Sequence, residues 1–219
     1  MDTAIARIIK ALDAGEHIRV FSDFDADGIP AAVLMNDLFK KLAHENFSVK
    51  IPHRNTEGFG LNERAVASAI EENVNLLITL DCGTGDAVHV EALMNAGIDV
   101  IITDHHKEGL TVPSAYAIVN PNQEGDTYPN KGLCGAGVAF KVATALIATL
   151  RAKGDARVND IPIGWEKWLL DMVGIATLSD MVPLVGENRA LAHFGLMVLR
   201  KSKRAGIDAL FDEVRVRKS

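Results

Sequence analysis

The chain has 219 residues, 48% of them apolar, which suits one large domain with a hydrophobic core or a domain with a small appendage. A formal net charge of −6 argues against indiscriminate binding of polyanions, so any grip on phosphate must be local. Cys82 and Cys134 have no CxxC spacing, which argues against a disulfide framework or a zinc–thiolate site. No run approaches the roughly 20 apolar residues of a membrane span, and residues 1–14 resemble an amphipathic helix rather than a signal peptide. We therefore expect a cytoplasmic protein without membrane contact.

The first half of the chain alternates short apolar runs with amphipathic segments. The apolar runs have the length of strands and are bounded by polar or turn-forming residues, and the segments between them have helical spacing. In this repeated order they predict an α/β fold with a doubly wound, mostly parallel five-stranded sheet, whose ligands bind beyond the carboxyl ends of the strands. We expect strands at residues 17–21, 49–52, 76–80, 99–103 and 117–119, and helices at residues 3–14, 30–42, 62–72 and 86–96.

The second half of the chain has a helical character. A polar loop over residues 122–132 leads into it, and a charged stretch with helix breakers interrupts it at residues 152–164. We predict an α/β metal-binding core over residues 1–125 and a helical continuation of the same domain over residues 126–219, which carries the last metal ligand. The helices of this continuation are expected at residues 135–151, 165–178 and 188–200.

Four separated groups of acidic and histidine residues stand out. The aspartate-rich run at residues 22–28, Asp81, and the Asp-His-His run at residues 104–106 each follow a predicted strand directly, and Ser179-Asp180 follows a predicted helix. The carboxyl ends of parallel strands meet at one edge of a sheet, so these side chains are expected to gather there. Carboxylate oxygens with a few imidazoles favour magnesium or manganese. The sequence therefore predicts a divalent-metal centre with hydrolase chemistry.

Each group also has a plain structural interpretation. The Asp-x-Asp-x-Asp-Gly run resembles half of a calcium loop, but the glutamate needed at loop position 12 would be Leu34, inside an apolar helix. Taken alone, Asp81 is more simply a helix cap, and Asp180 is a weak signal. His105 and His106, beside an acid at the end of a buried strand, have no obvious packing role. We interpret His105 as a metal ligand and His106 as an acid or a phosphate contact.

In combination, these segments resemble the DHH phosphoesterase superfamily, and within it the RecJ-like single-strand exonucleases. The resemblance covers about residues 17–210 and is specific, because the mundane interpretations do not predict all the groups at strand ends in this order. The matching segments are residues 22–28, 52–54, 57–61, 79–83, 104–106, 119–121, 133–141, 179–184 and 187–189.

The resemblance implies two manganese or magnesium ions and a water between them that is activated to hydroxide and attacks phosphorus. Asp23 and the bridging Asp81 would help to hold one of the ions. Asp27 would be a nearby support or an occasional ligand, and His106 would assist proton transfer or contact the phosphate. The other ion would be surrounded by Asp25, Asp81, His105 and Asp180.

The sequence leaves alternatives open for the residues that would contact the substrate. By resemblance Arg54 lies near a terminal phosphate, although a solvated loop arginine is an equal alternative. Arg189 contacts the strand or forms a structural salt bridge. The segment that contains Gly135 and Gly137 precedes a helix and either directs N–H groups to phosphate or serves close packing. The tryptophan pair at residues 165 and 168 has helical spacing and is predicted to be core rather than a base-stacking platform.

The resemblance implies hydrolysis of single-stranded DNA from the 5′ end, with RNA or short oligonucleotides as other substrates. Pyrophosphatases and cyclic-dinucleotide phosphodiesterases of the superfamily commonly have a histidine where this chain has Arg19, which favours the nuclease branch. A non-catalytic replication or repair scaffold is disfavoured because the ligand set is intact, whereas dependence on a partner stays open. RecJ-like enzymes continue into a second, DHHA1-type substrate domain, and residues 211–219 contain no glycine-rich motif of that kind. We expect a minimal protein, a fragment, or a chain that borrows the missing surface from a protein partner or a second copy.

Overall fold

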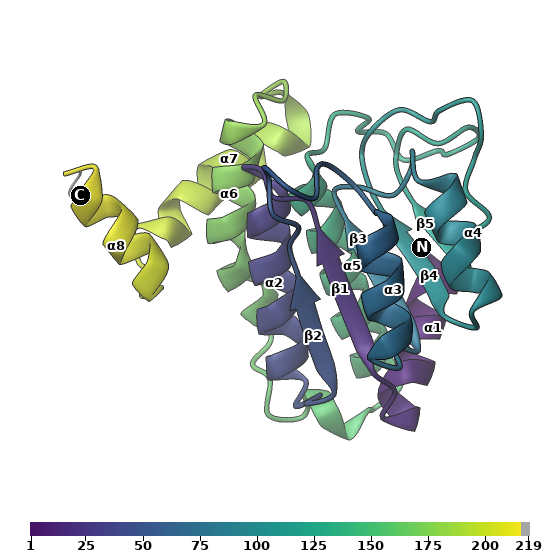
Figure 1. Cartoon of the computed structure of the whole chain (residues 1–219). Helices are drawn as coiled ribbons and strands as arrows, with labels where there is room; N and C mark the ends of the chain where they lie inside the picture. The colour runs from purple at the N-terminus through teal and green to yellow at the C-terminus, as the bar shows by residue number, and fades with distance from the viewer. Residues whose placement is uncertain (216–219) are drawn as a thin grey trace.

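A computed structural model describes residues 1–215, so residues 216–219 of the predicted helical continuation lie outside the described residues. Its centre is an all-parallel five-stranded sheet in the order β2-β1-β3-β4-β5 (Figure 1). The sheet and its order agree with the predicted doubly wound fold. The strands are β1 (Ile18–Ser22), β2 (Phe47–Lys50), β3 (Leu76–Leu80), β4 (Asp99–Thr103) and β5 (Ala117–Val119).

The register of the sheet aligns the ends of its three central strands. Ser22 at the end of β1 pairs with Leu80 at the end of β3, and Leu80 pairs with Thr103 at the end of β4. The residue after each of these ends therefore lies at the same level of the sheet. All three residues that follow are aspartates, which places the acidic groups side by side.

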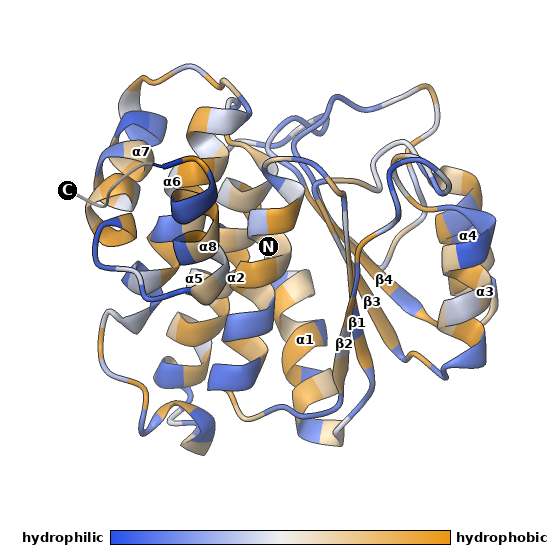
Figure 2. Ribbon diagram, turned by 60° about the vertical axis from the view of Figure 1, so that its left-hand side comes forward, coloured by the Kyte–Doolittle hydropathy of each residue, from blue (hydrophilic) through white to orange (hydrophobic). Residues whose placement is uncertain are grey.

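Helices cover both faces of the sheet (Figures 1 and 2). One face packs against α1 (Asp2–Ala14), α2 (Gly28–Lys41) and α5 (Gly135–Ala152) in the larger hydrophobic core. The other face packs against α3 (Glu63–Glu71) and α4 (Ala87–Asn95) in the smaller core. Strand residues alternate between the two cores because successive side chains of a strand point to opposite faces, and two-sided burial requires the continuous apolar runs seen in the sequence.

The carboxyl-terminal helices extend the layer that contains α2 and α5. Gly174 and Gly195 lie where α6 (Leu170–Ser179) and α7 (Gly186–Leu199) cross: a Cβ atom added to Gly195 would lie 2.5 Å from the Cα atom of Gly174. This close approach fixes α6, whose carboxyl end is followed by Asp180. The elements are the 3-10 helices η1 (Ala156–Val158) and η2 (Trp165–Leu169), and the helices α6 (Leu170–Ser179), α7 (Gly186–Leu199) and α8 (Ala205–Glu213).

Several details differ from the sequence predictions, among them the first five residues of the helix predicted at residues 165–178, which form the 3-10 helix η2. The second strand begins two residues earlier than expected, at Phe47. Trp165 packs against the larger core, but the core prediction is wrong for Trp168, which is 54% exposed because it faces an open cavity of about 690 Å³ between η2 and α7. Helix α8 was not predicted; it buries none of its residues and projects from the body of the molecule (Figure 1).

Helix α5 is the one helix of the described chain that is long and apolar enough to cross a membrane by length and composition alone. It is 18 residues long, and 61% of it is buried inside the fold. A core helix packed between a sheet and other helices passes the same test, so this observation is weak support for a membrane span.

Candidate metal centre

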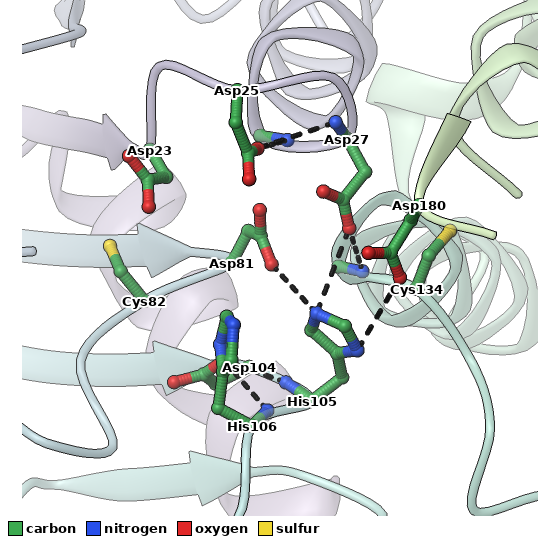
Figure 3. Close-up of polar contacts among 12 residues, drawn as sticks. Asp23, Asp25, Asp27, Asp81, Cys82, Asp104, His105, His106, Cys134 and Asp180 are labelled. Atoms are coloured by element: carbon green, nitrogen blue, oxygen red, sulfur yellow. Dashed lines mark hydrogen bonds and ion pairs between the residues drawn. The ribbon is translucent and has the colours of Figure 1, made fainter. Parts of the chain in front are cut away.

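Four aspartates and a histidine from separate segments point toward a common space at the carboxyl edge of the sheet (Figure 3). Asp81 follows β3, and His105 lies two residues beyond β4. The loop between β1 and α2 and the end of α6 supply the others. Among the described residues, three sets of donors lie within 4.8 Å of one another: Asp81 with His105 and His106, Asp27 with His105 and Asp180, and Asp25 with Asp27 and Asp81.

Asp81 is the centre of this cluster. It is completely buried, and neither of its carboxylate oxygens has a hydrogen-bond partner among the described residues. The nearest cationic candidate, His105 Nε2, lies 3.1 Å from Asp81 Oδ1, without the geometry of a hydrogen bond. Burial, and then the charges of Asp27 and Asp25, raise the pKa of Asp81 to about 11. The helix-cap interpretation is excluded, because α4 begins only after Asp86.

In the turn between β1 and α2, Asp25 and Asp27 differ in their hydrogen bonds and in the direction of their pKa shifts. Asp25 Oδ1 accepts hydrogen bonds from the N–H groups of Asp27, at 3.4 Å, and Gly28, at 3.0 Å. Burial acts to raise the pKa of Asp25, but the hydrogen bond from Gly28 and further hydrogen bonds leave it lowered. Asp27 Oδ2 accepts one from Gly135 N–H at 2.7 Å. Burial, with the charges of Asp180 and Asp25, raises the pKa of Asp27 to about 6.

His105 spans the space between the strand ends and the helical layer. Its Nε2 atom lies 3.7 Å from Asp27 Oδ2, and its Nδ1 atom lies 3.9 Å from Asp180 Oδ2. Burial raises the pKa of Asp180. The helical half of the chain thus contributes a carboxylate to a group built on the sheet, as its position after α6 requires.

Asp23 stands apart from this group. It lies outside the three described sets of donors, and its Oδ1 atom accepts a hydrogen bond from Phe24 N–H at 2.6 Å. Burial raises the pKa of Asp23. With Asp81 and His106 it lines an open cavity of about 300 Å³ on the other side of Asp81. Asp81 therefore borders two adjacent spaces.

Asp104 has a role that the sequence analysis did not assign. It is buried, and its Oδ1 atom lies 2.7 Å from Nδ1 of His106 and also accepts from the backbone N–H of His105, while Oδ2 accepts from Thr84 N–H. Although burial acts to raise it, these bonds, led by that of His106, hold the pKa of Asp104 far below its usual range. The same bond raises the pKa of His106.

Two asparagines hold the backbone of the same turn. Asn120 Nδ2 donates to the carbonyl oxygen of His106 at 2.8 Å, and Asn122 Nδ2 donates to that of His105 at 2.6 Å. Both follow β5, at the edge of the sheet. The segment that contains Asn120 was among the matching motifs, but nothing in its spacing indicated this contact.

The family model described as "DHH family, N-terminal domain" matches residues 17–177. The chain belongs to the DHH family. It is 40% identical over 210 residues to the single-stranded-DNA-specific exonuclease RecJ of Bacillus subtilis (strain 168), covering 96% of this chain and 25% of the relative. It is 37% identical to RecJ of Escherichia coli (strain K12), covering 97% of this chain and 37% of the relative. This chain thus spans about a quarter to just over a third of those relatives.

Solved DHH-family structures share the fold. A crystal structure of exonuclease RecJ bound to manganese matches with a TM-score of 0.83 and 31% identity, over 99% of this chain and 52% of that one. RecJ of Thermus thermophilus in complex with Mn²⁺ matches with a TM-score of 0.78 and 29% identity, over 99% of this chain and 29% of that one. These likenesses confirm the resemblance and the fold class predicted from the sequence.

The four predicted substrate contacts of this DHH chain have different surroundings. Arg54 is exposed, and its guanidinium carbon lies 4.7 Å from the centre of the Phe24 ring. Arg189 is exposed and forms no ion pair with residues 1–215, so the salt-bridge alternative is not seen there. The N–H of Gly135 is bonded to Asp27, and a Cβ atom on Gly135 would lie 2.4 Å from Asp81 Oδ1. Gly137 is buried against Leu133. Both glycines thus lie in close contact with neighbouring side chains.

The surroundings of Leu34 and Arg19 bear on two alternatives raised by the sequence. Leu34 is fully buried in α2, as expected of a residue that cannot ligate calcium. Arg19, where other branches carry a histidine, is buried in β1 and bonds to Glu72 and to Ser48 Oγ, the latter at 2.8 Å. It is directed into the α3 side of the sheet and away from the acidic cluster.

Proposed function

We propose that this chain is the catalytic part of a divalent-metal-dependent phosphodiesterase that hydrolyses single-stranded DNA from its 5′ end. The observation that carries the proposal is the Asp81 carboxylate, which is fully buried beside Asp25 and Asp27 with no hydrogen bond to either oxygen among the described residues. An unpaired buried carboxylate is strongly unfavourable unless a cation or a proton neutralises it. A divalent cation supplies the partner that the described part of the chain lacks.

The donor set fits manganese or magnesium. Carboxylate oxygens with few imidazoles and no free thiolate suit such ions, and the pKa of the nearby Cys134 thiol is raised to about 12 by burial. When bound, these ions acidify water and neutralise charge on a phosphodiester. We propose two ions. A first would be held by Asp25, Asp81, His105 and Asp180 with Asp27 in support, and a second by Asp23 and Asp81.

His106 is the proposed proton-transfer group. Its side chain is 58% exposed, and Asp104 occupies its Nδ1 atom at 2.7 Å. Nε2 is therefore the nitrogen that can meet a phosphate oxygen or a leaving group. Because the hydrogen bond with Asp104 raises the pKa of His106, the imidazole keeps its proton to a higher pH than an isolated histidine does.

The choice of substrate is supported by the names of the relatives, which are single-stranded-DNA-specific exonucleases. Arg54 is proposed to contact the 5′-terminal phosphate, and Arg189 is proposed as a second contact with the strand. Gly135 and Gly137 are proposed to act through packing. A protein partner or a second copy of the chain that adds contacts with the strand is also proposed, with the cytoplasm as the compartment.

The domain proposal follows from the same cluster. Residues 1–125 and residues 126–215 are proposed to form a single domain, because Asp180 of the second part faces His105 of the first. Gly135 N–H also bonds across the two parts to Asp27. Neither part would hold the full donor set alone.

The proposal is tested with end-labelled DNA and RNA strands that carry a 5′-phosphate, incubated with purified protein and manganese. We expect mononucleotides to be released from single-stranded DNA, and the rate to fall by more than about a hundredfold in Asp81→Ala and His105→Ala. Asp13→Asn is the matched control, since Asp13 is an exposed carboxylate paired with Arg157. A purified protein that leaves single-stranded DNA intact in the presence of manganese contradicts the proposal.

A further inference from the structure

Arg54 contacts an aromatic pair, Phe24 and Phe59, beside the acidic cluster. The guanidinium carbon of Arg54 lies 4.7 Å from the centre of the Phe24 ring, and the Phe24 ring lies 4.4 Å from that of Phe59. Phe24 is 7% exposed and sits between Asp23 and Asp25, whereas Phe59 is 70% exposed. Arg54 is thus stacked on a ring that belongs to the metal-binding turn itself.

Glu57, the carboxylate of the loop that contains Arg54, has partners other than Arg54. Glu57 Oε2 accepts a hydrogen bond from His53 N–H at 2.6 Å. Glu57 Oε1 lies 3.9 Å from the ammonium of Lys50 and 3.7 Å from Nε of Arg64. Within residues 1–215, Arg54 forms no ion pair with any carboxylate, although Asp23 and Asp25 flank the ring beneath it.

This arrangement separates two properties of a guanidinium. The guanidinium carbon lies over the Phe24 ring, a contact that uses none of the N–H donors in a hydrogen bond, and those donors form a planar fork suited to two phosphate oxygens. Without the ring, a flexible arginine beside an acidic cluster would gain an ion pair with Asp23 or Asp25. That ion pair would take up the same donors. Stacking also orders the long side chain before any ligand arrives, which lowers the entropy lost on binding.

We propose that Phe24, supported by Phe59, is a positioning residue that holds Arg54 away from the carboxylates so that its fork is available to a terminal phosphate. The inference rests on the proposed function only in assigning Arg54 to the 5′ end of the strand. A terminal phosphate monoester carries more negative charge than an internal diester. The aromatic support should therefore act on the preference for phosphorylated ends rather than on strand binding in general.

The test is a double-mutant cycle measured by two readouts. The variants are Phe24→Leu, Phe24→Tyr, Arg54→Ala, and Phe24→Leu combined with Arg54→Ala. Binding of a fluorescent DNA octamer with a 5′-phosphate or a 5′-hydroxyl is measured by anisotropy in EDTA, and its hydrolysis is measured with manganese. Phe194→Leu is the matched control, because Phe194 is a half-exposed phenylalanine on α7.

We expect Phe24→Leu to reduce the preference for the 5′-phosphate about three- to tenfold, and Phe24→Tyr to restore it because the ring is kept. In the Arg54→Ala background, Phe24→Leu should change the preference no further. The proposal is overturned if Phe24→Leu weakens the binding of the 5′-phosphate and 5′-hydroxyl octamers equally, or if its effect on the preference persists in the Arg54→Ala background. It is also overturned if the parent protein binds the two octamers equally in EDTA. If the parent protein prefers the 5′-phosphate octamer in EDTA but hydrolyses no DNA with manganese, that result contradicts the proposed function alone.

Discussion

Gly135→Ala should abolish metal binding while leaving the fold largely intact. A Cβ atom at this position would lie 2.4 Å from both Cβ and Oδ1 of Asp81, more than 1 Å inside ordinary contact distance. Asp81 is fully buried and cannot move outward, so it must shift toward Asp25 and Asp27 or force α5 away. Overpacking of this kind destabilises a fold by about 1–3 kcal/mol. Displacement of a ligand by about 1 Å can reduce activity about a hundredfold.

Gly137→Ala provides the matched control in the same helix. Its added Cβ atom would lie 3.3 Å from a terminal methyl carbon of Leu133, which can give way. Neither substitution removes an N–H group, so the comparison isolates the space that each glycine leaves. We expect the manganese-induced rise in Tm, measured by differential scanning calorimetry, to vanish in Gly135→Ala and persist in Gly137→Ala. Equal manganese responses of the two variants would refute the packing argument.

Three further predictions concern pH, the His106 turn and the helix crossing. Because the pKa of Asp27 is raised from 3.8 to about 6, the ionisation of Asp27 should by itself remove about 3 kcal/mol from the stability of the metal-free protein as pH rises from below 4 through 6. Manganese should therefore stabilise the protein more at pH 8 than at pH 5. Calorimetry in EDTA and in manganese checks the sign, and a manganese effect that shrinks as pH rises contradicts it. Asp104→Asn should lower the pKa of His106, as measured by NMR titration, and slow hydrolysis about tenfold or more. An unchanged titration of His106 would contradict the role of Asp104 in raising that pKa. Gly195→Ala should destabilise the fold by about 1–3 kcal/mol in urea, because its Cβ atom would lie 2.5 Å from backbone atoms of α6, whereas Gly206→Ala meets nothing within 4 Å and should be neutral or stabilising.

The strand ends could be predicted from the sequence because two local signals coincide there. A fully buried strand needs a continuous apolar run, and the acid that follows marks where the chain leaves the core. Parallel pairing in register then brings Asp81 and Asp104 to one edge without further information. The predicted strands were therefore accurate to within two residues, and the gathering of the aspartates that follow β1, β3 and β4 came from the sheet topology alone.

Other features depend on contacts between distant segments. The position of Asp180 follows from the crossing of α6 and α7 at Gly174 and Gly195, which no local pattern reveals. Trp168 has the same helical spacing as a core residue, but the neighbouring helices leave a cavity beside it. The contact of Asn120 with the His106 backbone spans 14 residues and belongs to no short motif.

The acids of the site divide into two kinds, and this division explains how so many can share one space. Asp104 and Asp25 accept several hydrogen bonds, their pKa values are lowered, and they hold the turns in place whether or not an ion is bound. Asp81 accepts none among residues 1–215, and its pKa is raised by burial beside other acids, so the metal-free fold tolerates it only by keeping it protonated at neutral pH. A divalent cation must displace that proton, which makes binding tighter as pH rises. The hydrogen-bonded acids Asp104 and Asp25 therefore make the site rigid, whereas the buried charge of Asp81 is unfavourable. A bound cation gains the most free energy by neutralising Asp81.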